Sequence, residues 1–174
     1  MKLGLSWVVG AVFAAVLATT AGAAPERVDA KKDWSVFETV REGAKICWVV
    51  SRPIETQATR GGQKVEVRRG PIFLMVSMRP GQGVTNEVSF LSGYPFKGGS
   101  KVKLSVGSTN FSLFTEGENA WALSAAEDGQ ITNSFRRGSR ARVEGTSQRG
   151  TVTVDTFSLS GFTAAMKSAS DRCK

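Results

Sequence analysis

The stretch KICWVVS (residues 45–51) indicates the fold class, because it is short, rich in β-branched residues and stopped by Arg52-Pro53. Such a run predicts a β-strand. In its middle lies Cys47, one of two cysteines in a chain of 174 residues, and the other, Cys173, is the penultimate residue. Whether these two thiols form a disulfide depends on the compartment in which the protein resides, and the N-terminal sequence indicates that compartment.

The first residues have the three-part pattern of a secretory signal peptide. Lys2 precedes an almost entirely apolar run over residues 3–17, and Ala21-Gly22-Ala23 follows. The pattern predicts a signal peptide over residues 1–23, cleaved between Ala23 and Ala24. An uncleaved membrane anchor is the alternative, but the apolar run is shorter than the roughly 20 residues that span a bilayer. We therefore expect a periplasmic or secreted protein with no transmembrane segment in the mature chain.

In an exported protein, two cysteines placed as Cys47 and Cys173 are expected to form one disulfide bond. The bond would tie the C-terminus to the strand at residues 45–51. Two buried free thiols and a redox pair are the alternatives, and the C-x-x-C spacing of a redox pair is absent.

Strand patterns cover most of the chain on either side of residues 45–51. Residues 71–78 are almost wholly apolar and flanked by prolines, which predicts a central strand buried on both faces. Residues 101–106 alternate, so one face should be exposed to water. Residues 110–115 and 119–124 are expected to pair as a hairpin. The other strand patterns are residues 34–39, 87–92, 140–145 and 151–155.

Two segments break the strand pattern and predict helices. Asp128 is expected to cap a short helix that carries Ile131 and Phe135 on one face and ends at Gly138. Ser160 is expected to cap a C-terminal helix over residues 161–172.

Roughly eight or nine short strands with two helices predict a mainly β fold, either an antiparallel β-sandwich or a flattened barrel. The pattern indicates one domain over residues 34–174, preceded by a flexible lead-in over residues 24–33. A domain of this size can bury a core without a structural metal.

The sequence is poor in catalytic residue types, since it contains no histidine. Serine and cysteine arrangements that need a histidine base are impossible, and two thiols cannot make a zinc site. We expect no enzyme activity, no metal and no cofactor. One pair of acids stays open: Asp128 and Asp155 could act together in glycoside hydrolysis, although a helix cap and a turn or salt bridge explain them as well.

Basic residues outnumber acids, with 23 Lys and Arg against 15 Asp and Glu and a net charge of +8. Such an excess favours anionic partners, but it also serves solubility alone. Guanidinium groups suit phosphate, sulfate and carboxylate. The candidate contact residues are Arg136, Arg137, Arg140, Arg142 and Arg149 in the C-terminal part, and Arg60, Lys64, Arg68 and Arg69 in the polar segment of residues 56–70. Nucleic acid is not expected, because exposed aromatic residues between these charges are lacking.

Several short motifs carry a resemblance to a known family. They are FRRG (residues 135–138), RGT (residues 149–151), DTFSLSGFTAA (residues 155–165) and the closing Cys173, with Trp34 and Cys47 upstream. In these motifs the chain resembles the invasion-associated locus B family of exported proteins from Gram-negative bacteria.

The resemblance implies a non-enzymatic protein of the cell envelope and supplies no functional residues to carry over. We expect it to act by binding an anionic envelope component or a host-surface protein, with the partner unknown. Two alternatives stay open: a carboxylate-dependent hydrolase of envelope glycans, and a structural accessory subunit of an envelope complex.

Overall fold

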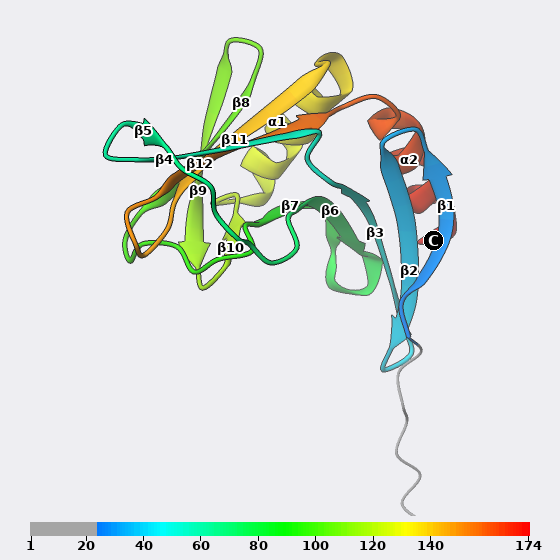
Figure 1. Ribbon diagram of the computed structural model, residues 1–174. Helices are drawn as coiled ribbons and strands as arrows, with labels where there is room; N and C mark the ends of the chain where they lie inside the picture. The colour runs from blue at the N-terminus through cyan, green and yellow to red at the C-terminus, as the bar shows by residue number, and fades with distance from the viewer. Residues whose placement is uncertain (1–23) are drawn as a thin grey trace, which may run out of the picture.

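Twelve strands form one antiparallel sheet in the computed structural model, which describes residues 24–174 (Figure 1). The strand order across the sheet is β1-β2-β3-β6-β7-β10-β9-β8-β11-β12-β4-β5. The predicted signal peptide and its cleavage site lie outside the described residues.

The elements have the following bounds. The strands are β1 (Glu26–Lys31), β2 (Trp34–Arg41), β3 (Ala44–Ser51), β4 (Glu55–Arg60), β5 (Gln63–Lys64), β6 (Phe73–Arg79), β7 (Val84–Leu91), β8 (Lys101–Val106), β9 (Thr109–Glu116), β10 (Asn119–Trp121), β11 (Arg140–Thr146) and β12 (Val152–Ser158). The helices are the 3-10 turn η1 (Pro80–Gln82), α1 (Ala125–Arg137) and α2 (Phe162–Arg172).

The sheet is not closed, because it runs from an edge at β1 to an edge at β5. The prediction of a mainly antiparallel β fold with one mid-chain and one C-terminal helix is confirmed. Of the two architectures expected, the open sheet agrees with the sandwich. The hairpin expected across residues 116–118 is also present, as β9 paired with β10.

The sheet bends around a hydrophobic core, so strands that are far apart in the strand order come into contact. The indole Nε1 of Trp34, at the start of β2, donates to the carbonyl of Ser158 at the end of β12 over 3.0 Å. The ring of Trp34 packs against Phe135 of α1 and Phe162 of α2, at centroid distances of 6.4 and 4.9 Å. Both helices therefore meet at one buried tryptophan on the inner face of the sheet.

Helix α1 begins four residues earlier than the sequence suggested, and its cap is Ser124. The Ser124 Oγ accepts a hydrogen bond of 3.2 Å from the amide of Glu127, so the prediction of Asp128 as the cap is wrong. Asp128 lies in the first turn, where its Oδ1 accepts from the amide of Val88 on β7 over 2.8 Å. Ile131 and Phe135 are buried as expected.

Helix α2 begins at Phe162, and the expected cap at Ser160 is also wrong. The capping position is Gly161, whose φ of 91° is left-handed and which provides no side chain. The apolar face predicted for this helix is correct, because Phe162, Ala165, Met166 and Ala169 are buried.

Two further expectations need correction. Residues 26–31, expected within a flexible lead-in, form β1, because they pair along β2. Residues 71–78, expected to be buried on both faces, overlap β6, in which buried and half-buried residues alternate. The reason is that both helices described cover the same face of the sheet, so the other face of β6 remains partly open.

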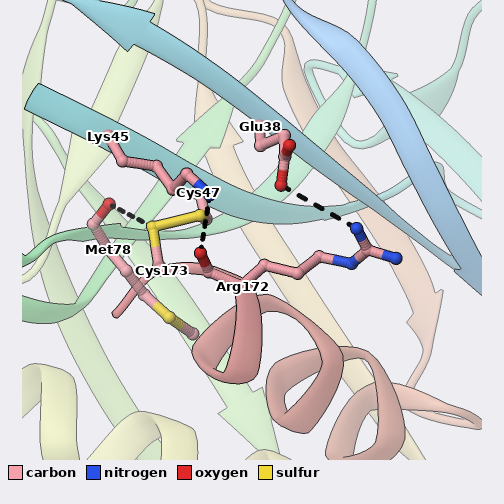
Figure 2. The surroundings of a disulfide bond; sticks show 6 residues. All are labelled: Glu38, Lys45, Cys47, Met78, Arg172 and Cys173. Atoms are coloured by element: carbon pink, nitrogen blue, oxygen red, sulfur yellow. Dashed lines mark hydrogen bonds and ion pairs between the residues drawn. A yellow bond between two sulfur atoms is a disulfide. The ribbon is translucent and has the colours of Figure 1, made fainter. Parts of the chain in front are cut away.

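The disulfide between Cys47 and Cys173 confirms the predicted pairing (Figure 2). It joins β3 to the end of α2, with the two Cα atoms 5.9 Å apart. Lys45 Nζ donates to the carbonyl of Arg172 over 2.9 Å, and Arg172 lies 4.0 Å from the carboxylate of Glu38. The sulfur of Cys173 lies 4.0 Å from the carbonyl oxygen of Met78, which is a contact and not a hydrogen bond, since a disulfide sulfur carries no proton.

Candidate anion-binding pocket

Basic residues from two distant parts of the sequence line one pocket of about 470 Å³. Arg60 comes from the end of β4, Arg68 from the segment between β5 and β6, and Arg149 from the turn between β11 and β12. Their side chains are accompanied by polar groups of Tyr94, Thr151 and Thr153. The pocket thus unites members of both groups of candidate residues.

The local folding of two turns explains this convergence. Strand β4 pairs with β12 so that Thr59 is opposite Val152, which places Arg60 beside the turn that carries Arg149. Gly61 and Gly62 then reverse the chain into β5, and the segment that follows returns toward β6. The amide of Gly70 donates to the carbonyl of Gly93 over 2.9 Å, which holds this segment against the turn of Tyr94.

Arg60 is oriented by a buried hydroxyl. Its Nε and Nη2 atoms both donate to Oγ1 of Thr151, over 3.0 and 2.8 Å. Thr151 is 3% exposed. A guanidinium held in this way keeps its remaining N–H donors available to a ligand, so Arg60 lines the pocket as a cation whose orientation is fixed.

Arg69 also lines the pocket, but its guanidinium is bound inside the protein and is not a free contact. Its Nη1 and Nη2 atoms donate to the two carboxylate oxygens of Asp155, each over 2.7 Å. The side chains of Arg69 and Asp155 are 7% and 0% exposed. Arg69 also donates from Nε and Nη2 to the carbonyl of Ser92, over 3.0 and 2.6 Å. Burial raises the pKa of Asp155, and the bonds from Arg69 oppose that rise.

Tyr94 links this buried pair to the pocket. The Arg69 guanidinium carbon lies 4.9 Å from the centre of the Tyr94 ring, a cation–π arrangement. The phenol oxygen is 2.7 Å from Oγ1 of Thr153. Burial raises the pKa of the Tyr94 phenol above its usual value. Tyr94 was not predicted as a site residue, although it is the only tyrosine of the sequence and lies in the turn Gly93-Tyr94-Pro95.

The balance of charge in the pocket is positive. Arg60, Arg68 and Arg149 are exposed, while Glu66 and Glu118 are the acidic residues of the lining. Arg69 adds no net charge because Asp155 neutralises it. The arrangement can offer guanidinium donors and neutral hydroxyls to a phosphate, sulfate or carboxylate group.

The other arginines of the C-terminal part lie elsewhere. In the register of β11 with β12, Arg140 is opposite Ser158 and Arg142 is opposite Thr156. Because side chains alternate along a strand, these arginines point away from the face that carries Thr151 and Thr153. Arg142 lies 3.8 Å from Glu144, its neighbour on that outer face.

Three more predicted contact residues are also outside the pocket. Arg136, in the last turn of α1, donates to Oδ1 of Asn133 over 2.9 Å and lines a different hollow beside α2. Arg137 is exposed at the end of the same helix. Lys64 of β5 lines a shallow hollow along β4.

Asp128 and Asp155 are not arranged as a catalytic pair. Both oxygens of Asp155 are engaged by Arg69 inside the protein, so no substrate can reach them. Asp128 lines a separate hollow beside β7, and burial raises the pKa of its carboxyl. Within residues 24–174, no three Asp, Glu or Cys side chains gather as metal ligands would.

Residues 34–170 match the family model described as Invasion associated locus B (IalB) protein. No curated protein and no solved structure matches the chain. In the part of the chain that the structure describes, no helix combines the length and the apolar character needed to cross a bilayer.

Proposed function

The chain belongs to the invasion associated locus B family, and we propose that it works as an exported, non-enzymatic protein of the cell envelope that binds an anionic partner. The binding site in this proposal is the pocket of Arg60, Arg68 and Arg149. The partner is an anionic component of the envelope or an acidic host-surface protein.

The observation that carries the proposal is the convergence of these three guanidinium groups. Arg60 and Thr151 are 91 residues apart in the chain, yet two hydrogen bonds join them. Positioning one cation before a ligand arrives lowers the conformational entropy that binding must overcome. Arg68 and Arg149 add exposed charge from two other segments of the chain, which suits a group with several acceptor oxygens.

Export is supported by the disulfide between Cys47 and Cys173, because such bonds persist mainly outside the reducing cytosol. The N-terminal sequence pattern of a signal peptide points to the same compartment. The net charge of +8 would favour association with anionic envelope surfaces.

The test compares two variants that lose the same charge. Arg68→Gln with Arg149→Gln removes two cations from the pocket, and Arg140→Gln with Arg142→Gln removes two from the outer face of β11. The folded domain is bound to phosphocellulose and to purified bacterial envelope, and the salt concentration that elutes half of it is measured. We expect the pocket variant to elute at clearly lower salt than both the wild type and the β11 variant.

Equal losses in the two variants would mean that only net charge matters, and the pocket would then have no special role. Retention that does not respond to salt would contradict an anionic partner altogether. Circular dichroism of both variants checks that the fold is unchanged, which is expected because all four side chains are exposed.

A further inference from the structure

Apolar side chains cluster on the outer face of β2, β3 and β6, although neither helix described covers it. On these strands the fully buried residues alternate with half-buried ones. The half-buried set includes the aromatic and aliphatic side chains Phe37, Trp48, Val50, Phe73 and Met75. A sheet face that only meets water normally carries polar residues at such positions, so this composition calls for another explanation.

These side chains line a groove of about 580 Å³. Ile54, in the connection after β3, extends the apolar lining and is 53% exposed. The volume lies within the range of pockets that hold small organic molecules. The pocket of Arg60 and this groove share no lining residue, so the two are separate surfaces.

The rim of the groove is cationic. Arg27 of β1, Lys32 of the β1–β2 turn and Arg52 after β3 all line it and are exposed. Asp33 is the one acidic residue among the lining side chains. The groove therefore combines an apolar floor with a positive edge, which is the complement of an anionic amphiphile.

The aromatic rings favour an alkyl chain over a sugar ring. Phe37 and Trp48 stack on each other, with centroids 5.5 Å apart and planes inclined by 9°. The guanidinium carbon of Arg52 lies 5.4 Å from the centre of the Phe73 ring. Each ring thus has a face covered by a neighbour, whereas an alkyl chain can pack along ring edges and the aliphatic groups of Val50 and Met75.

A second copy of the chain is a poorer occupant. A two-fold symmetric contact through the groove would bring the same cationic rim of both copies together. Like charges facing one another across an interface are unfavourable.

We propose that this groove binds an anionic lipid, with its alkyl chain along Trp48, Val50 and Met75 and its charged headgroup beside Arg27, Lys32 and Arg52. The inference is independent of the proposed function, because it uses other residues. It gives the protein a hydrophobic contact with the envelope in addition to an electrostatic one.

The experiment measures binding of monomeric dodecyl phosphate to the folded domain by titration calorimetry. Val50→Thr with Met75→Gln keeps the side-chain sizes similar but removes apolar surface, and Arg52→Gln removes one rim charge. Leu123→Gln is the matched control, since Leu123 is a large apolar side chain, 61% exposed, in a different hollow. Dodecyl maltoside, which has the same alkyl chain but no charge, tests the role of the headgroup. Inorganic phosphate, which has the charge but no alkyl chain, tests the role of the alkyl chain.

We expect dodecyl phosphate to bind the wild type and the Leu123→Gln variant equally. The Val50→Thr and Met75→Gln double variant should bind about tenfold more weakly, because the loss of two methylene-sized contacts corresponds to about that factor. Arg52→Gln should weaken dodecyl phosphate but leave dodecyl maltoside unchanged.

Other results would overturn the proposal. Equal binding of dodecyl phosphate by the wild type and the double variant would remove the groove as its site. If inorganic phosphate binds as tightly as dodecyl phosphate, the alkyl chain contributes nothing to the affinity. If dodecyl maltoside binds as tightly as dodecyl phosphate, the negative charge of the headgroup contributes nothing. Concentration-dependent dimerisation of the wild type, abolished in the double variant, would assign the groove to a second copy of the protein.

Discussion

Gly161 is the residue at which the C-terminal helix meets the first strand. Its φ of 91° belongs to the left-handed region, which side chains other than glycine rarely adopt. A Cβ atom at this position would collide with the carbonyl oxygen of Lys31 on β1. Both the backbone conformation and the close approach of another strand therefore require glycine.

We predict that Gly161→Ala destabilises the protein by about 2–5 kcal/mol, the sum of left-handed strain and overpacking. Gly107→Ala is the matched control, because Gly107 also has a positive φ, 58°, but nothing lies within 4 Å of its would-be Cβ. The control should lose only about 1–2 kcal/mol. Urea unfolding of the three proteins measures the difference, and equal losses would show that the contact with Lys31 is unimportant.

At the scale of elements, strand β1 is held by α2 as well as by β2. The carboxylate of Asp29 accepts a hydrogen bond of 2.6 Å from Ser168 of α2 and lies 3.1 Å from Lys31. These partners, Ser168 first, lower the pKa of Asp29 from 3.8 to about 2. The ionised carboxylate is therefore the form that ties the edge strand to the helix.

This tie should make stability depend on pH. A carboxyl whose pKa is lower in the folded state stabilises fully above the unfolded value of 3.8, and loses that contribution as the pH falls toward about 2. We predict that the gap in urea midpoint between the wild type and Asp29→Asn is constant above pH 5 and narrows between about pH 4 and pH 2. The gap in urea midpoint between the wild type and Ser168→Ala should narrow over the same pH range, and by most of the same amount. A gap that stays constant down to pH 2 would contradict the assigned partners.

At the scale of the whole molecule, the disulfide joins the C-terminal end of the fold to its third strand. Cys47 and Cys173 are 126 residues apart, and the bond fastens the end of α2 to β3, the third strand in the sheet order (Figure 2). Lys45 and Glu38 hold Arg172 beside it. The terminal helix is thereby kept over the inner face of the sheet, where Trp34 contacts Phe162.

We predict that Cys47→Ala with Cys173→Ala lowers the free energy of unfolding by about 4–5 kcal/mol, the value that the chain-entropy model assigns to a loop of this length. The wild type treated with reductant should unfold at a similarly low urea concentration, and reductant should not affect the double variant. Intact mass before and after reduction should differ by two hydrogens. A wild type whose stability ignores reductant would show that the bond does not stabilise the fold.

The features that the sequence predicted are local ones. Alternation in residues 101–106, the apolar face of Phe162 and Met166, and the strand around Cys47 depend on neighbouring residues, and the structure agrees with each. The cap positions were missed by a few residues, because Ser124, Asp128, Ser160 and Gly161 all have side chains or backbones suited to a helix start. Packing of the Gly161 backbone against Lys31 decided between Ser160 and Gly161, and the hydrogen bond from the amide of Val88 on β7 engages Asp128, which leaves Ser124 as the cap of α1.

By itself, the sequence determined that the chain folds as mainly antiparallel β-structure, which segments form its helices and which two cysteines pair. Only the tertiary structure decided which basic residues form a site. The strand order brings Arg60 beside Thr151 and Arg149. The alternating direction of side chains along β11 turns Arg142 away from this site, and Arg69 is buried in an ion pair with Asp155. The physical reason is that periodicity and turns are local, whereas the neighbour of a strand and the face it presents depend on how the whole core packs.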